Sequence, residues 1–523
     1  MDDIRSRIYR VSHDSMRGRQ AGEVGNVMMT NYLVTELARI GLEPGGDNGT
    51  YLQTIPMVRR RPDTTSTLTV GDEALGVFVH FAPVRPTSSL RSGTKLSATR
   101  AATIYGGRAG DTTVVLAPDV VAGKIVVLDA ALGTDGKPTG TYTTPTGLAV
   151  SQFPTAAAVA VAALDLVSAT ANASIRGRGN GLAINPADRP LALLVSRDAA
   201  QKLMGARLES LRPGAAGRAA SARIGFIDEP VRAPARNVIG ILRGSDRNLR
   251  GQLVAIGAHS DHIGIDTRTV DHDSLRAFNR VMRPEGIQTS LRTPTPAERA
   301  RIRSILDSLR RLSPPRLDSI NNGADDDGSG SVAALEIAQS LASGRPPRRS
   351  ILFVWHTAEE GGLLGSSWFA DNPTVSRDSI VAQLNMDMVG RGPDSLRGRP
   401  HMLQIIGSRR LSSELGDIVE VVNRARASPF LIDYSYDAPR HPLNRYCRSD
   451  HYNYARHGIP IAYFSRGYHE AYHTVIDEAQ YIDFEGLAEV ARLVRDVAAA
   501  IADRAERIVV DKPRMNPRAP CLQ

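Results

Sequence analysis

Apolar runs of strand length alternate with segments of helical periodicity in the part of the chain after residue 237. The apolar runs lie at 253–258, 351–355, 380–384, 403–406 and 461–464. The helical segments lie at 332–341, 414–425 and 486–502. Uninterrupted apolar strands are typical of a parallel sheet that is covered by helices on both faces. The pattern therefore predicts an α/β domain with a mostly parallel, doubly wound mixed sheet flanked by helices.

The stretch before this domain has a different pattern. Residues 24–40 have helical apolar spacing and are followed by Gly41, a residue that is favoured just after the last turn of a helix. A short alternating strand is predicted at 66–70. We assign these segments to an N-terminal part of the main domain, residues 1–76.

A module rich in short β runs, Gly, Ala and Thr follows at 77–232. Within it, an Ala-rich helix is expected at 156–166. The expected strands lie at 113–116, 124–128 and 191–195. We interpret the module as an inserted β-rich domain with its own small core. The main domain then resumes over 233–505 and is followed by a C-terminal tail, 506–523.

A second insertion, residues 266–320, interrupts the alternation of strands and helices. Thr295 and Glu298 form a capping box, with Pro296 at the first helical position. The apolar stripe of this helix consists of Ile302, Ile305, Leu306, Leu309 and Leu312. We expect a surface helix that packs on the domain; a lid or a partner-binding helix is the alternative.

Composition narrows the possible functions. A chain of 523 residues exceeds one ordinary core, so two or three domains are expected. The net charge is +9, but the arginines are scattered and aromatic residues make up only 5%. Because nucleic-acid binding needs clustered basic residues and stacking aromatics, we expect no nucleic-acid partner. No apolar stretch of about 18 residues occurs, so no membrane span is expected.

Histidines and carboxylates of the kind that bind metal ions occur in five short segments of the main domain. The residues are His259, Asp326, Glu359, Glu360, Asp387 and His473. His259, the Glu pair and Asp387 each follow a predicted strand, and the carboxyl ends of parallel strands meet at the edge of a sheet where ligands bind. The combination indicates a two-metal site in which activated water attacks a carbonyl.

Charge also favours metal ions at this edge. Asp326, Glu360 and Asp387 would bring three negative charges into one cleft, which costs free energy unless the charges are compensated. Two Zn²⁺ ions supply four positive charges, and a bound hydroxide would neutralise the one that remains. A bridging carboxylate holds two such ions about 3.5–4 Å apart.

These segments resemble the zinc aminopeptidases of the M28 class, di-zinc exopeptidases that often carry an inserted protease-associated (PA) domain. The first metal motif of the family is similar to residues 257–262, its bridging-aspartate loop to 323–330, and its Glu-Glu segment to 355–365. Residues 77–232 resemble the PA domain. The resemblance implies a phosphorylase/hydrolase-like zinc peptidase fold, two Zn²⁺ per chain and peptide substrates.

The resemblance also implies a role for each metal-binding residue. Asp326 would bridge both metals, and the peptide bond after it is expected to be cis. His259 and Asp387 would complete one site, and Glu360 and His473 would complete the other.

Further roles are implied for residues around the metals. Glu359 would be the general base that acts on a water bridging the metals. Asp261 would accept a hydrogen bond from His259 and fix its tautomer. Tyr472 would stabilise the oxyanion. Asp450 is a candidate pocket residue.

The expected function is that of a metallo-aminopeptidase, a zinc-dependent hydrolase of the N-terminal peptide bond. A carboxypeptidase-type M28 hydrolase and a glutaminyl-cyclase-like acyltransferase on the same fold are the alternatives. Such cyclases work with a single zinc, whereas the ligand set here is complete for two. A non-catalytic receptor would have lost ligands, and a serine hydrolase would need a G-x-S-x-G elbow, which is absent.

Location and cysteine pairing stay open. The first residues contain no apolar region of a secretory signal, while the resemblance implies a secreted or periplasmic protein. Neither Cys447 nor Cys521 belongs to a C-x-x-C pair, so a cysteine-based zinc site is not expected. A disulfide between them and two unrelated thiols are both compatible with the sequence.

Overall fold

The computed structural model describes residues 2–86, 92–111, 113–132, 149–183, 189–312, 314–393 and 402–517, together with Cys521 and Gln523. The chain divides into two compact units. Unit 1 comprises Met1–Ile55, Arg232–Met515 and Leu522–Gln523, and unit 2 comprises Pro56–Val231 and Asn516–Cys521. Unit 2 thus begins at Pro56, earlier than the boundary expected at residue 77.

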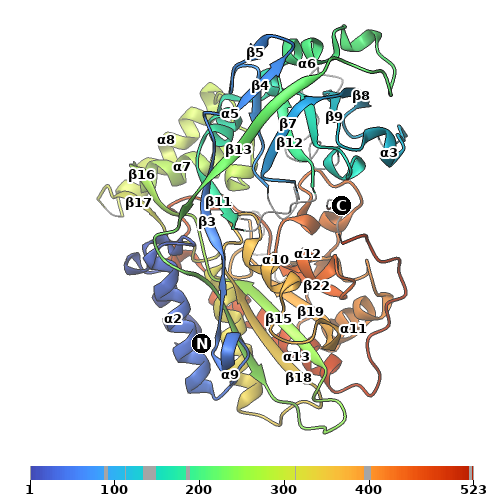
Figure 1. Cartoon of the computed structure of the whole chain (residues 1–523). Coiled ribbons are helices and arrows are strands. Elements are labelled where there is room, and N and C mark those ends of the chain that lie inside the picture. Colours follow the sequence, from blue (N-terminus) through green and yellow to red (C-terminus); the bar gives the residue numbers. More distant parts are fainter. Residues whose placement is uncertain are drawn as a thin grey trace. The chain divides into compact units, whose positions relative to one another are not determined.

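A mixed sheet forms the centre of unit 1, with nine strands among the described residues. The strand order is β1-β14-β18-β15-β19-β22-β20-β21, and β2 also pairs with β14. The central strands, which are mutually parallel, are β18 (Ser350–His356), β15 (Leu253–His259), β19 (Ile380–Met386) and β22 (Ile461–Ser465) (Figure 1). The outer strands are β1 (Glu43–Pro44), β2 (Leu52–Ile55), β14 (Ala235–Leu242), β20 (Met402–Ile406) and β21 (Leu431–Asp433). The five predicted strands of this domain are confirmed.

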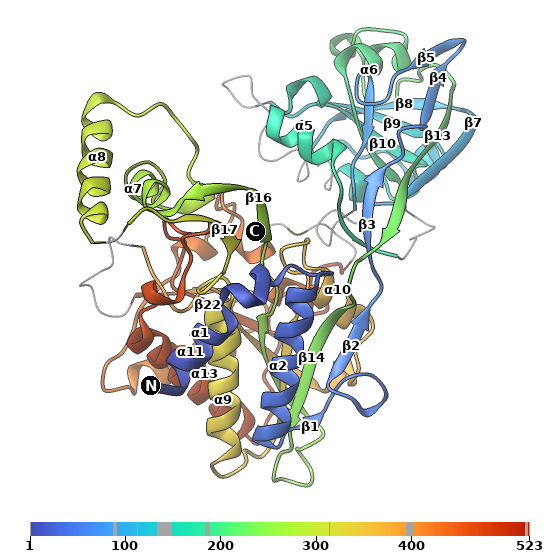
Figure 2. The ribbon, with the colours of Figure 1, turned by 90° about the vertical axis from the view of Figure 1, so that its left-hand side faces the viewer.

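Helices cover both faces of this sheet, as the doubly wound prediction requires. The first face is covered by α1 (Asp2–Val11), α2 (Val24–Ile40), α9 (Gly328–Ala342), α11 (Ser413–Arg424) and α13 (Phe484–Ala502) (Figure 2). Successive residues of a strand point to opposite faces. Trp355 of β18 accordingly lies in the core on the first face. The next residue, His356, packs against Phe369 of α10 (Leu364–Asp371) and Tyr454 of α12 (His451–Ala455).

Helix α9 begins earlier than its apolar pattern predicts. The prediction started at residue 332, but the helix starts at Gly328, because the carboxylate of Asp327 caps it by accepting a hydrogen bond from Gly330 N. The first turn contains only Gly and Ser, so hydrophobic periodicity could not reveal it.

Unit 2 contains two sheets and its own buried core. Within the described residues, one sheet has the order β6-β12-β10-β9-β8 and the other β11-β3-β13-β4-β5, with β7 also paired to β13. The strands are β3 (Met57–Pro62), β4 (Thr67–Val70), β5 (Glu73–Leu75), β6 (Phe81–Pro83), β7 (Lys95–Ala101), β8 (Thr103–Arg108), β9 (Ile125–Asp129), β10 (Ala158–Ala162), β11 (Gly179–Leu182), β12 (Leu191–Val195) and β13 (Ala220–Pro230). The helices include α3 (Pro118–Val121), α5 (Ala169–Arg176) and α6 (Arg197–Met204).

Two sequence predictions in unit 2 are wrong. The Ala-rich run at 156–166 is not a helix: Ala158–Ala162 is strand β10, fully buried between the parallel strands β9 and β12. Burial on both faces outweighs the helix propensity of alanine in so short a run. The run at 113–116 does not form a strand. Val115 in this run is 83% exposed, so its side chain packs in no sheet core.

The insertion at 266–320 is bracketed by two paired strands, β16 (Gly264–Asp271) and β17 (Leu317–Asn321). Between them lie α7 (His272–Met282), which was not predicted, and α8 (Pro296–Arg310). Helix α8 packs against α7, and its Arg310 pairs with Asp271 at 2.7 Å. The predicted surface helix and its capping box are therefore confirmed. None of the described α8 residues is fully buried, and Leu312 beyond its end is 84% exposed.

We expect Thr295→Ala to lower the free energy of local opening of α8 by about 1 kcal/mol, because the hydroxyl accepts a hydrogen bond from Glu298 N at the helix start. Hydrogen exchange of the α8 amides measures this free energy. Thr293→Ala, in the exposed loop before the helix, is the matched control and should leave the exchange unchanged. Equal exchange in both variants would contradict the assignment of the cap.

The described helices include none that combines the length and the apolar character needed to cross a bilayer. Both cysteines, Cys447 and Cys521, are disulfide-bonded, which answers the question that the sequence left open.

Candidate metal centre

The predicted metal-binding residues come from loops at the carboxyl edge of the parallel strands. His259 is the last residue of β15, and Asp387 directly follows β19. Glu359 and Glu360 follow β18 after two residues. Asp326 lies between β17 and α9, and His473 lies in the loop after β22. The structure brings all of these side chains together.

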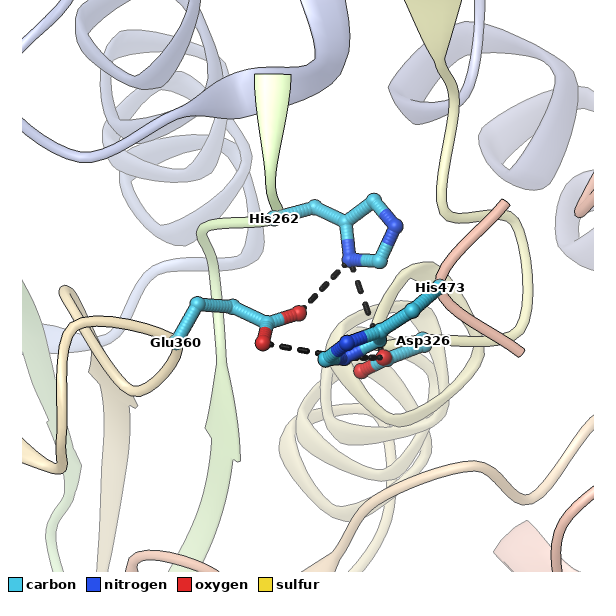
Figure 3. Close-up of side chains that lie close together, drawn as sticks. All are labelled: His262, Asp326, Glu360 and His473. Atoms are coloured by element: carbon cyan, nitrogen blue, oxygen red, sulfur yellow. Dashed lines mark hydrogen bonds and ion pairs between the residues drawn. The ribbon is translucent and has the colours of Figure 1, made fainter. Parts of the chain in front are cut away.

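One group of side chains surrounds the Oδ2 atom of Asp326 (Figure 3). His473 Nε2 lies 3.0 Å from Asp326 Oδ2 and 3.0 Å from Glu360 Oε2. His262 points into the same group: its Nδ1 lies 2.8 Å from Glu360 Oε1 and 3.7 Å from Asp326 Oδ2. The candidate ligand atoms of these four residues all lie within 4.8 Å of one another. His262 belongs to the motif identified in the sequence, but no role was predicted for it.

A second group surrounds the other oxygen of the same carboxylate. His259 Nε2 lies 3.1 Å from Asp326 Oδ1 and 3.8 Å from Asp387 Oδ1. Asp326 therefore faces one group with each of its two oxygens. This is the arrangement that a carboxylate bridging two cations requires.

The buried polar atoms of the two groups fit metal ions. Asp326 Oδ2 and His473 Nε2 are buried without a hydrogen-bond partner, although they lie 3.0 Å apart. The two atoms thus point toward each other without forming a hydrogen bond. Buried polar atoms that lack a hydrogen-bond partner are explained when an ion lies between them. Imidazole nitrogens and carboxylate oxygens are ligands that suit Zn²⁺.

The adjacent glutamates have opposite pKa shifts. Burial raises the pKa of Glu359 well above its usual range, and the nearby Glu360 and Asp387 carboxylates add to this rise. Burial also acts to raise the pKa of Glu360, but His473 and His262 outweigh it and lower that pKa to about 2. The neighbouring carboxyl groups therefore favour different protonation states: Glu360 stays anionic, and Glu359 holds a proton more readily.

The pKa of Asp326 is also held well below its usual range. Burial would raise it, but the adjacent imidazoles of His259 and His473 outweigh the burial. The carboxylate shared by both groups is therefore ionised throughout the neutral pH range.

Residues 237–498 match the family model described as peptidase family M28. This stretch is half of the chain and contains every residue of the two groups. The chain belongs to peptidase family M28. The resemblance of the main-domain segments to the M28 class is thereby confirmed.

Relatives of this M28 peptidase include proteins that are named aminopeptidases. Leucine aminopeptidase 1 of Aspergillus oryzae is 31% identical over 194 residues, 34% of this chain and 47% of the relative. Leucine aminopeptidase 1 of Emericella nidulans is 29% identical over 206 residues, 38% of this chain and 50% of the relative. The chain thus spans about half the length of the curated relatives it matches. A solved aminopeptidase from Aneurinibacillus sp. strain AM-1 is 18% identical with a TM-score of 0.47, over 98% of this chain and 97% of that one.

Asp261 orders the Glu-Glu segment of this M28 peptidase rather than the His259 ring. Its carboxylate accepts hydrogen bonds from Glu359 N at 3.0 Å and from Glu360 N at 3.3 Å. The His259 Nδ1 atom instead lies 3.1 Å from the main-chain oxygen of Asp261, and 3.8 Å from its carboxylate. The predicted carboxylate–histidine contact is therefore corrected to a main-chain contact, because both carboxylate oxygens are occupied by the backbone amides.

The loop that carries Asp326 is fixed by its neighbours. The peptide bond between Asp326 and Asp327 is cis, as the resemblance implied. The carboxylate of Asp327 accepts hydrogen bonds from the backbone N–H of His259 at 3.0 Å and of Met388 at 3.2 Å. It thereby ties the Asp326 loop to the ends of β15 and β19.

A buried network behind this loop was not predicted. Asp477 accepts hydrogen bonds from the backbone N–H groups of Asp325 and Asp326, at 3.1 and 3.0 Å. His469 Nε2 lies 3.0 Å from Asp325 Oδ2. The only sequence signal is that both residues flank His473 in a His- and acid-rich loop.

The 266–320 insertion braces the loop that carries His473. Asn279 of α7 donates to the main-chain oxygen of Glu470 at 2.8 Å. Gly286 has φ +55°, and a Cβ there would lie 2.5 Å from the Tyr472 main-chain oxygen, so only glycine permits this close approach. Tyr472 itself is buried, and its ring stacks on His473 with centroids 4.0 Å apart.

Arg19 is a further buried residue that the sequence did not single out. Its guanidinium donates hydrogen bonds to the main-chain oxygens of Val11 at 2.9 Å, Asn322 at 2.5 Å and Gly323 at 2.8 Å. One buried cation thus fastens the N-terminal segment to the start of the Asp326 loop.

We expect Arg19→Met to lower the free energy of local opening of this loop by about 2–4 kcal/mol, because it leaves several buried carbonyls without a donor. Hydrogen exchange of the Ala324, Asp325 and Asp326 amides measures the effect. Arg10→Met, an exposed arginine on α1, is the control. Unchanged protection in the Arg19 variant would show that the guanidinium does not support the loop.

Proposed function

We propose that this M28 peptidase is a zinc-dependent exopeptidase that hydrolyses the N-terminal peptide bond of peptides. The observation that carries the proposal is the position of Asp326, whose two oxygens each face a separate group of histidine and carboxylate ligands. The names of the aminopeptidase relatives support the choice of an N-terminal bond.

Two Zn²⁺ ions per chain fit the two groups. Asp326 would be shared, His259 and Asp387 would complete one site, and Glu360 and His473 would complete the other. When bound, the ions would polarise the scissile carbonyl and lower the pKa of water. His262 would hold Glu360 in place through its 2.8 Å contact.

Glu359 would act as general base and then as general acid. Its raised pKa, caused first by burial, lets it accept the proton of the attacking water and later release it to the leaving amine. Asp261 would hold Glu359 in position through its backbone amide. Glu359 also lies 4.0 Å from His259, next to the candidate ligands.

Tyr472 would donate a hydrogen bond to the oxyanion. Burial raises the pKa of Tyr472 well above its usual range, so its hydroxyl keeps the proton that it would donate. Its stacking on His473 holds the ring beside the ligand group that contains His473 and Glu360.

The test is a matched substrate panel with a metal assay. Leucine p-nitroanilide should be hydrolysed, and its N-acetyl form should not. Activity should disappear with a chelator and return with Zn²⁺, and the purified protein should contain close to two zinc ions per chain. Cleavage of blocked peptides alone would overturn the aminopeptidase assignment, and one zinc with ring closure of glutaminyl peptides would indicate a cyclase.

A further inference from the structure

A pocket next to the candidate metal centre is lined by groups of both charges. Its empty volume is about 290 Å³. The acidic lining residues are Asp326, Glu359 and Asp387, and the basic ones include Arg445 and Arg448. The metal chemistry accounts for the acids, but it gives no role to the two arginines.

Arg445 is a buried cation whose hydrogen bonds go only to neutral groups, and the carboxylate that attracts it, Asp387, lies beyond ion-pair distance and belongs to the candidate metal centre. Its guanidinium donates to the Tyr463 hydroxyl at 2.6 Å, to Ser465 Oγ at 2.9 Å and to Gln404. It also lies 4.5 Å from the centroid of the Tyr468 ring. In the described part of the chain no carboxylate lies within ion-pair distance of it. A buried charge without a counterion is costly unless a partner is supplied.

Arg448 lies three residues further along, and its side chain is exposed at the same pocket. Among the described residues its hydrogen-bond partner is neutral, Gln288 Oε1 at 3.0 Å. Gln288 belongs to the 266–320 insertion, so the insertion helps to position this guanidinium.

A third arginine of the same segment shows the contrast. Arg456 is as buried as Arg445, but it pairs with Asp371 at 2.9 Å, and it is not among the residues that line the pocket. Pairing with a carboxylate is thus available to a buried arginine in this fold. The two arginines without such a pair are those that face the pocket.

We propose that Arg448, with Arg445 behind it, binds a carboxylate group of the peptide substrate. The proposal rests on the function proposed above and names the substrate class of the same site. The planar guanidinium matches a carboxylate in a two-point contact. The acidic lining of the pocket would meet the ammonium group of the same substrate.

The carboxylate can come from two sources. It is either the side chain of an N-terminal glutamate or aspartate, or the free C-terminus of a dipeptide. Both present the same group to the arginines, so only substrates that differ in one of the two carboxylates separate them.

Two isosteric substrate pairs make this separation with the zinc-loaded full chain. Glutamyl and glutaminyl p-nitroanilide differ only in the side-chain carboxylate, and Leu-Gly and its amide differ only in the C-terminal one. For one pair we expect kcat/KM to be about 10–100-fold higher for the member that carries the carboxylate. The pair that shows this preference identifies the source.

Variants assign the preference to the arginine. Arg448→Met should bring the ratio within the preferred pair close to one, and Arg448→Lys should retain part of it, because the charge stays but the planar fork is lost. Arg250→Met, an exposed arginine remote from the pocket, is the control and should leave the ratio unchanged.

The outcomes distinguish this proposal from the proposed function. Ratios near one in both pairs, with clear hydrolysis of leucine p-nitroanilide, overturn carboxylate recognition and leave the aminopeptidase intact. If no substrate with a free N-terminus is hydrolysed, the proposed function fails. Calorimetry then tests separately whether the pocket binds a carboxylate. In that case the proposal is supported if glutamic acid α-amide binds more tightly than glutamine α-amide, or if Leu-Gly binds more tightly than its amide. The difference in affinity must also disappear in Arg448→Met. Equal binding within both pairs overturns it.

Discussion

Replacement of Glu359 by glutamine is expected to lower kcat by about 10³-fold while the zinc content stays the same. The substitution keeps the size of the side chain and its backbone contact to Asp261, but it removes the carboxylate that accepts the proton. Glu359 belongs to neither group of converging ligand atoms, so metal binding does not depend on it. Steady-state kinetics on leucine p-nitroanilide and metal analysis of the same sample measure the two quantities.

The control for this variant is Glu506→Gln, an exposed glutamate remote from the centre. It should match the unmodified protein in both measurements. Near-normal turnover in the Glu359 variant would remove Glu359 as the base. Loss of zinc together with turnover would instead make it a ligand.

Asp326→Asn should have the broadest effect, since one carboxylate serves both ligand groups. The amide keeps the shape but loses the charge that His259 and His473 approach at 3.1 and 3.0 Å. We expect the zinc content to fall from about two ions per chain to below one. Activity should fall by at least about 10³-fold with it, because base and metals act together.

Thermal unfolding gives a second readout for Asp326. A ligand that binds only the folded state of a protein raises the free energy of unfolding by RT ln(1 + [L]/Kd). Zn²⁺ should therefore raise the melting temperature of the unmodified chain but not that of the variant. Asp266→Asn, an exposed aspartate in β16, is the control. A variant that retains two zinc ions would exclude Asp326 as the shared ligand.

The meeting of His259, Asp387 and the Glu pair could be predicted because it follows from strand direction alone. Each of these residues follows an apolar run that forms a strand, and parallel strands have their carboxyl ends at the same edge of the sheet. Asp326 and His473 were singled out by residue type, and their individual roles as ligands came from the family resemblance of their loops. The roles of Arg19 and Asp477 were not reachable, because their contacts join loops that lie far apart in the chain and leave no periodicity in it.

The error at Ala158–Ala162 has a different physical origin. Five consecutive small apolar residues satisfy a helix and a buried strand equally well, and only the flanking strands β9 and β12 decide between them. The correction of Asp261 is similar. The family resemblance predicted that its carboxylate binds His259, but the competition from two backbone amides is visible only in three dimensions.

The pairing of Ile55 with Ala235 in adjacent strands β2 and β14 has a consequence for biosynthesis. The chain leaves the main sheet at Ile55 and returns beside the same point only after the whole of Pro56–Val231 has been made. At roughly 5–20 residues per second, the nascent N-terminal helices wait many seconds on the ribosome before their sheet exists. The interposed unit can collapse during that interval, and the apolar faces of α1 and α2 are the surface that a chaperone would have to shield.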